Sequence, residues 1–283
     1  MALFGFGRPK LPENPQELVD LGLDYYKGNN RAKDLDMALK CFEKAAQKGS
    51  AAGARNAGLM YRDGEGTRVN IQTALTYLEQ SYHLGKTNSA FTIGLIFAKE
   101  EYGVLDVPKA LHWYTIAAEA GNSNAMYNMA VLYGNGKGGI PVDRSKRFYW
   151  YMKAAEAGDK EAQYYVGLAF MEADGCEKDL LKAAYWAQKS ANNGDKDAVG
   201  LLEKIENQKT IDENYRAGKR HWDAKDYEAA LQPLKTAMEA GSAEAKACLG
   251  YMYFTGNAVA RDAQTGFDMM AQAYKDNSLV ACY

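Results

Sequence analysis

Apolar and small residues recur along the chain at helical spacing, and polar residues separate them at regular intervals. In the first repeat, Leu21 and Gly22 precede an aromatic residue, Tyr25, by one helical turn. A pair of small residues that begins at Ala45 is followed by Gly49, and similar pairs recur downstream. Spacings of three, four and seven place such residues on one face of a helix. The pattern therefore predicts two helices in each repeat, packed closely through their small residues.

An Asp or Asn marks the predicted start of each second helix, and a small residue follows four positions later in every unit except one, where Arg147 stands. These markers are Asp34, Asn70, Asp106, Asp143, Asp179, Asp226 and Asp262. They are 36 or 37 residues apart, except for one interval of 47 residues. A side-chain oxygen at this position can accept from the free amides that open a helix, and the later glycine suits a left-handed C-cap. A fixed period in the thirties predicts a repeat array.

The segment from Asp106 to Gly121 carries the likeness to a known family. It contains Lys-Ala-Leu-His-Trp-Tyr from Lys109, and Ala-Ala-Glu-Ala-Gly from Ala117. Together with the Leu-Gly-x-x-Tyr pattern upstream, it resembles the Sel-one-like repeat, a longer relative of the tetratricopeptide repeat. The resemblance covers roughly residues 15–277. It implies an all-α fold, a right-handed α-solenoid of about seven helix-turn-helix repeats, to which the spacing adds one unpaired helix.

The repeat spacing predicts four segments. Residues 1–14 form a lead-in, 15–195 hold five Sel-one-like repeats, 196–210 form an unpaired joint helix, and 211–283 hold a tetratricopeptide-like repeat, a final Sel-one-like repeat and a tail. The joint is predicted because the stretch between Gly194 and Gly218 is longer than its counterparts and carries apolar residues at helical spacing. A rigid joint would keep one continuous groove, whereas an exposed linker would split the array into two surfaces.

Charge and hydropathy narrow the class of protein. The 34 basic and 36 acidic residues give a formal net charge of −2, which offers no electrostatic case for nucleic acid or an anionic membrane. No apolar run reaches about 18 residues, so we expect no membrane-spanning helix. The first ten residues lack the basic region and cleavage site of a secretion signal. We therefore expect a cytoplasmic protein.

The four cysteines also indicate a reducing compartment. Cys41, Cys176, Cys248 and Cys282 form no Cys-x-x-Cys motif and share no repeat position, so we expect free thiols. This pattern argues against the cysteine-rich branch of the family, in which each unit carries a disulfide. The penicillin-related activity of that branch is not carried over to this chain.

The sequence offers little catalytic chemistry. His83, His112 and His221 are more typical of structural or solvent-facing positions, and none has metal-ligand spacing, so we expect no metal, cofactor or catalytic site. Residues 134–139 match the G-x-G-x-x-G pattern, but they fall in a predicted inter-helix loop and not between a strand and a helix. The aromatic residues of the second helices, such as Trp113 and Trp150, are expected to pack between helices.

The first helices carry the candidate binding residues. In tetratricopeptide-like superhelices the first helix of each pair lines the concave side, so the resemblance places equivalent positions of each repeat there. The selected residues are Arg55, Arg62, Phe91, Tyr127, Tyr164, Met171, Tyr215, Trp222 and Phe254. Tyr and Trp dominate binding hot spots. The alternative is that curvature buries some of them against the next unit. The two arginines either pair with an acidic segment of a partner or are solvated.

These observations favour a non-catalytic scaffold or adaptor that binds a partner protein or peptide in its concave groove. One alternative is a bacterial immunity protein that neutralises a secreted toxin through one tight complex. An alternative from another class is a hydrolase acting on a lactam or cell-wall substrate, which the missing disulfides and missing export signal oppose. The sequence does not separate the adaptor from the immunity protein.

Overall fold

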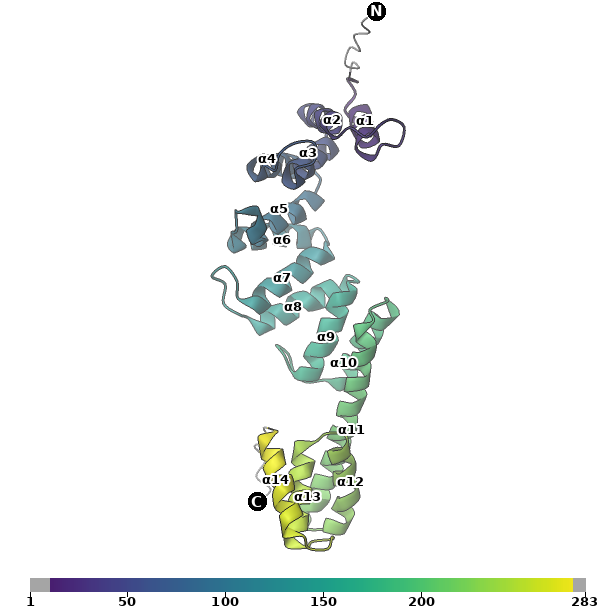
Figure 1. The fold of residues 1–283 in the computed structure, drawn as a ribbon, viewed down its shortest axis with the longest axis vertical. Helices are drawn as coiled ribbons and strands as arrows, with labels where there is room; N and C mark the ends of the chain where they lie inside the picture. The colour runs from purple at the N-terminus through teal and green to yellow at the C-terminus, as the bar shows by residue number, and fades with distance from the viewer. Residues whose placement is uncertain (1–10, 277–283) are drawn as a thin grey trace, which may run out of the picture. The chain divides into compact units, whose positions relative to one another are not determined.

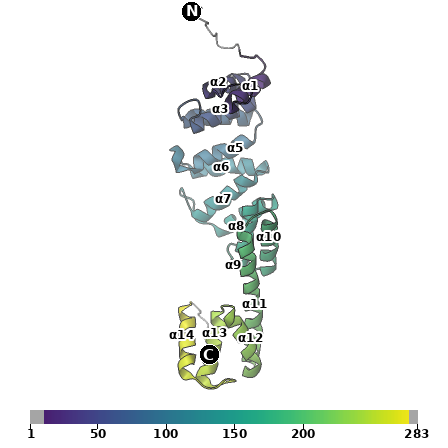
Figure 2. The ribbon, with the colours of Figure 1, turned by 45° about the vertical axis from the view of Figure 1, so that its right-hand side comes forward.

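The structure is a computed structural model that describes residues 11–276 of the chain. Within these residues it contains fourteen α-helices, one short 3₁₀ helix and no strand, which confirms the all-α solenoid class (Figures 1 and 2). The chain divides into two compact units, residues 1–163 and residues 164–283. The start of the predicted lead-in, residues 1–10, and the end of the predicted tail, residues 277–283, lie outside the described residues.

Unit 1 consists of helix pairs in which each helix packs against the next (Figure 1). Its helices are α1 (Pro15–Lys27), α2 (Leu35–Gln47), α3 (Ala51–Asp63), α4 (Ile71–His83), α5 (Asn88–Ala98), α6 (Val107–Glu119), α7 (Ser123–Asn135) and α8 (Arg144–Glu156), with the 3₁₀ helix η1 (Glu100–Tyr102) after α5. The first helices of neighbouring pairs also touch, α1 with α3 and α5 with α7.

Unit 2 begins within α9 (Lys160–Glu172), at Tyr164. It continues with α10 (Leu180–Asn192), α11 (Asp197–Asp223), α12 (Tyr227–Glu239), α13 (Ala243–Thr255) and α14 (Ala263–Lys275). Gly167 shows how closely α9 meets its partners, because a Cβ at this position would lie 3.1 Å from the Ala183 carbonyl oxygen of α10. Here too, the first helices α11 and α13 touch.

Helix α11 differs from the prediction of a separate joint helix over residues 196–210. The joint is helical, but it runs without a break into the first helix of the next repeat, so that α11 is 27 residues long. Its first half buries Ala198, Leu201 and Ile205, whereas Gly218 in its second half faces Leu234 of α12. No Gly or Pro lies between residues 201 and 217 to end the helix. A single helix therefore contributes to two successive layers of unit 2.

The predicted N-caps are confirmed in all seven second helices. Asp34 accepts from the Met37 amide at 3.0 Å, and Asn70 accepts from the Thr73 amide at 3.0 Å. Side chains of the other five markers cap α6, α8, α10, α12 and α14 in the same way. Such a bond satisfies one of the four free amides that open a helix. The markers thus fix where each second helix begins.

Left-handed glycines follow the second helices, as predicted, one residue after the C-cap position. Gly49, Gly121 and Gly158 follow second helices with φ values of 83°, 85° and 96°, a conformation that costs glycine little and other residues more. The glycine-rich segment 134–139 comprises the end of α7 and the loop before α8, with no strand before it in the described residues. Its glycines therefore belong to a turn between helices.

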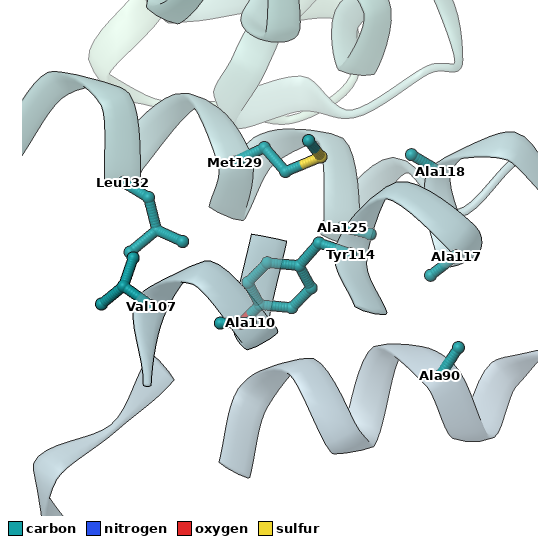
Figure 3. Close-up of a cluster of buried hydrophobic side chains, with 9 residues drawn as sticks. All are labelled: Ala90, Val107, Ala110, Tyr114, Ala117, Ala118, Ala125, Met129 and Leu132. Carbon is teal, nitrogen blue, oxygen red and sulfur yellow. The ribbon is translucent and has the colours of Figure 1, made fainter. Parts of the chain in front are cut away.

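The core between α5, α6 and α7 shows how large and small residues alternate (Figure 3). Tyr114 is only 1% exposed and lies among alanines, including Ala90 and Ala125, with Met129 above it (Figure 3). A Cβ on Gly94 would lie 2.6 Å from the Tyr114 ring, so the ring occupies the space that the glycine leaves. This confirms that small residues allow helices to approach while an aromatic side chain fills the gap.

Acid is expected to weaken the helix caps. A backbone hydrogen bond from Lys109 lowers the pKa of Asp106 below its ordinary value of 3.8, and bonds from residues three positions on do the same for Asp143, Asp179 and Asp262. A carboxylate with a depressed pKa stabilises the fold above the unfolded-state pKa and loses that contribution as the pH falls through the folded-state pKa. The urea midpoint is therefore expected to fall between pH 5 and pH 3.

A variant with all four of these aspartates replaced by asparagine provides the control. Asparagine caps helices about as well as aspartate but does not titrate in this range. The variant is expected to lose less stability between pH 5 and pH 3 than the wild type. Glu13, whose pKa is lowered to about 2 by hydrogen bonds from Lys48 and Lys44, titrates in both proteins and cancels in the comparison. An equal loss in both proteins would contradict this role of the caps.

Candidate partner-binding surface

Four of the residues predicted to bind a partner lie on first helices of unit 1: Arg55, Arg62, Phe91 and Tyr127. We call them the first-helix surface of unit 1. Arg55 and Arg62 lie seven residues apart on α3, which places them on the same side of the helix. Both are partly buried. Arg62 binds the adjacent Asp63 with two hydrogen bonds of 2.7 Å, and this carboxylate raises the pKa of Arg62. Burial lowers the pKa of Arg55, and Arg62 adds to the effect.

The two aromatic members of this surface take part in packing. Phe91 of α5 lies against the core cluster, with its ring centroid 6.0 Å from that of Tyr114. Tyr127 of α7 meets the buried Tyr151 of α8 edge-on at 5.5 Å. Each remains partly exposed. Both rings therefore help to pack the repeat and are not fully buried by it.

The first-helix surface of unit 2 comprises Tyr164, Met171, Tyr215, Trp222 and Phe254. Tyr164 is partly buried on α9, and burial raises its pKa, with Asp197 among the smaller causes. Met171 is partly buried further along the same helix. On α11, Tyr215 and Trp222 pack against the core of the last repeats. Phe254 of α13 is the most open of the five, with 42% of its surface exposed.

Trp222 is anchored by two neighbouring aromatic rings. Its ring meets Tyr227 at 5.3 Å and Tyr251 at 5.5 Å, in both cases edge-on. Edge-to-face contacts of this kind stabilise aromatic pairs beyond the area that they bury. A side chain held in this way loses little additional freedom when a partner covers it. Trp222 is therefore held in place by its neighbours.

Several exposed aromatic and aliphatic residues were not selected from the sequence. They lie on second helices or at their ends: Tyr149 of α8, Leu181 and Tyr185 of α10, and Phe267 and Tyr274 of α14. Lys153 lies over the ring of Tyr149, and Lys189 lies over that of Tyr185. The lysine four residues after the tyrosine is a sequence signal for this solvent-facing pair. By contrast, Trp113 and Trp150 pack against the core, as predicted.

Three open pockets in the described residues contain none of the nine selected residues. A pocket of ≈ 650 Å³ in unit 1 is lined by α4, α5, α6 and the loop before α6, including Phe97, Leu105 and Trp113. A pocket of ≈ 390 Å³ in unit 2 has a mixed lining of basic and acidic side chains, such as Lys209 and Asp212. A pocket of ≈ 180 Å³ lies between α1, α2 and α3. None brings together a nucleophile, a base and an oxyanion site.

Residues 11–276 also contain no cluster of His, Cys, Asp and Glu that could hold a metal ion. Cys41, Cys176 and Cys248 are free thiols. His112 is exposed beside Trp113, and His221 is exposed with Nδ1 4.0 Å from Asp226. No helix in this part of the chain has both the length and the apolar character of a membrane span.

Comparison with known proteins decides the family. The model of the Sel1 repeat matches residues 18–50, 51–86, 100–122, 123–159, 160–195 and 243–278, which together make up more than half of the chain. The chain belongs to the Sel1 repeat family. Residues 196–242 are not matched. They include all of α11 and α12, where the sequence predicts a joint and a tetratricopeptide-like repeat.

Solved structures of Sel1 repeat proteins are similar to this chain. A Sel1 repeat protein from Oxalobacter formigenes is 30% identical with a TM-score of 0.59, over 66% of this chain and 77% of that one. A protective antigen with an SLR fold, from uropathogenic Escherichia coli, is 25% identical with a TM-score of 0.57, over 94% of this chain and 58% of that one. No curated protein matches the chain.

An immunity protein from Pseudomonas aeruginosa is a more distant structural neighbour. It is 15% identical with a TM-score of 0.31, over 70% of this chain and 84% of that one. A likeness of this size carries no argument about function. Sel1 repeat proteins are in general protein-interaction scaffolds, and their fold is typically non-catalytic.

Proposed function

We propose that this Sel1 repeat protein is a non-catalytic scaffold that binds a partner protein or peptide on the first-helix surfaces of its two units. The observation that carries the proposal is the exposure of Phe254, a large apolar side chain at a position that Met171 and Trp222 occupy in the two preceding repeats. Exposed apolar patches on a protein surface mark interaction sites, and the proposal takes Phe254 as part of such a patch. The rings of Tyr127 and Trp222 also suit contact with a partner, because Tyr and Trp are enriched in binding hot spots.

The two surfaces are chemically different. Unit 1 presents two arginines and two aromatic side chains, whereas unit 2 presents four aromatic side chains and one methionine. A partner that contacts both units would therefore offer polar groups to unit 1 and apolar groups to unit 2. The proposal requires each surface to contribute to binding, and each can be tested by itself.

Replacing Phe254 by alanine is expected to weaken partner binding by roughly 10-fold or more, because truncating a hot-spot aromatic residue costs about 1–2 kcal/mol or more. Phe267→Ala is the matched control, since Phe267 is an even more exposed phenylalanine of the same unit but lies on the second helix α14. In unit 1, Tyr127→Ala and Tyr149→Ala form the corresponding pair.

The measurement is affinity capture from native lysate with partners quantified by mass spectrometry, after circular dichroism confirms that each variant folds. Loss of the same partner in Phe254→Ala and Tyr127→Ala, but in neither control, supports the proposal. Loss in Phe267→Ala or Tyr149→Ala alone would place binding on the second helices and refute it. One tight partner would favour an immunity role, and several weaker partners an adaptor.

A further inference from the structure

Arg55 is a partly buried cation for which residues 11–276 supply no ion-pair partner. Of its three guanidinium nitrogens, Nε alone is both shielded from solvent and without a hydrogen-bond partner. No ion pair in residues 11–276 involves this side chain. Burial lowers its pKa, and the one charged group that adds to the shift is the cationic Arg62. The guanidinium group therefore loses hydration without gaining a compensating carboxylate.

Arg62 has the opposite environment although it lies on the same side of α3. Its Nε and Nη2 donate to the two oxygens of Asp63 at 2.7 Å each, which is a bidentate pair. The nearby Glu65 is also engaged, because it accepts from the Tyr26 hydroxyl at 2.8 Å. Asp63 and Glu65 thus already have partners, and Arg55 takes part in neither of these contacts.

An unpaired and partly desolvated charge destabilises a fold, so a neutral residue would suit this position better if stability were the sole requirement. A group that arrives from outside the chain can supply the missing hydrogen bonds. A carboxylate fits, because its two oxygens match the fork of the guanidinium group. A phosphate, with nearly two negative charges, would need a second free cation, and Arg62 is occupied by Asp63.

We propose that Arg55 binds a side-chain carboxylate of an acidic segment in the partner, which makes it the recognition residue of the first-helix surface of unit 1. This inference rests on the proposed function, since it requires a partner on that surface. The pocket of ≈ 180 Å³ beside α3 is lined in part by Leu59, one turn beyond Arg55. An apolar side chain next to the acidic residue can enter this pocket.

The test uses a displayed library of random 12-residue peptides selected on the purified full-length protein. Affinities of the selected peptides, labelled with fluorescein, are measured by anisotropy on the wild type and on Arg55→Gln. The charge-matched control is Arg68→Gln, because Arg68 is an exposed arginine of the loop after α3. Tyr127→Ala reports whether a peptide occupies the surface at all.

The selected peptides are expected to be enriched in Asp and Glu and to lose roughly 10- to 100-fold in affinity on Arg55→Gln, as for a hydrogen bond to a charged group. Changing the acidic residue of the peptide to its amide is expected to weaken binding to the wild type by the same factor as Arg55→Gln does. The amide peptide is expected to bind the wild type and Arg55→Gln with the same affinity. Arg68→Gln is expected to bind within twofold of the wild type.

The melting temperature separates recognition from a structural role. Arg55→Met is expected to melt at the same temperature as the wild type or higher, because it removes a desolvated charge. A lower melting temperature together with unchanged peptide affinity would show that Arg55 serves packing, and would overturn the inference. The peptide amide variants test the wild-type protein directly, so the result does not depend on how an Arg55 variant folds.

The two proposals fail in different ways. Peptides that depend on Tyr127 but neither contain acidic residues nor respond to Arg55→Gln would overturn the role of Arg55 and leave surface binding intact. Peptides that respond to neither Tyr127→Ala nor Arg55→Gln, or a library that yields no binder, would overturn both.

Discussion

Tyr114→Ala is expected to lower the free energy of unfolding by about 3–5 kcal/mol, the usual cost of replacing a buried aromatic residue by alanine. Tyr114 is 1% exposed and fills the space between α5, α6 and α7 (Figure 3). Its neighbours include alanines, which are too short to move into the void, and the glycine at position 94 offers no side chain at all. Urea denaturation followed by circular dichroism measures the change.

Tyr114→Phe is the control, because it removes the hydroxyl group and keeps the ring. The hydroxyl accepts from Asn128 at 3.4 Å, which is long for a hydrogen bond. This variant is therefore expected to cost about 1 kcal/mol or less. If both variants lost similar stability, the hydroxyl contact and not the volume of the ring would hold this core together.

Gly266→Ala is expected to cost about 1–3 kcal/mol, even though alanine favours helix formation, because overpacking forces helices apart. A Cβ on Gly266 would lie 2.5 Å from the Gly250 carbonyl oxygen and 2.5 Å from the Phe254 amide nitrogen. Both are backbone atoms of α13, so no side-chain rotation relieves the clash. Most other repeats carry alanine at this position, which indicates that α13 and α14 approach more closely than most pairs.

Gly200→Ala, in the same unit, is expected to stabilise the protein, in contrast to Gly266→Ala. Gly200 lies within α11, and a Cβ there would meet no atom within 4 Å. This variant is expected to raise the free energy of unfolding by up to about 1 kcal/mol through helix propensity. Thermal and urea unfolding of the two variants should thus shift in opposite directions. A shift in the same direction for both would mean that close packing does not decide the effect at Gly266.

The helix pairs and their caps could be predicted from the sequence because their signals are local. The Asp or Asn at the start of a second helix bonds an amide two or three residues away, and the C-cap glycine needs its own backbone conformation. These features depend on near neighbours in the chain and repeat with them. The continuity of α11 was not predicted. The repeat spacing suggested a boundary near residue 210, but no residue there ends the helix.

The candidate surface was less predictable because exposure depends on residues far along the chain. Phe254 and Trp222 occupy equivalent positions of their repeats. Phe254 is exposed, whereas Trp222 packs against Tyr251 of the following first helix. From the sequence, Arg55 and Arg62 were predicted to have the same role. Only their surroundings distinguish them, since Arg62 has a carboxylate on its guanidinium group and Arg55 has none among the residues that the structure describes.

The uninterrupted α11 also ties the length of the chain to the direction in which its last repeats face. Each residue of an α-helix advances the chain by about 1.5 Å along the helix axis and rotates it by about 100° around that axis. Inserting one residue near Thr210 would therefore turn α12 to α14 by more than a quarter of a circle relative to α10, whereas seven residues would nearly restore their orientation. The last repeats therefore keep the direction in which they face only when the length of α11 changes by close to whole helical turns.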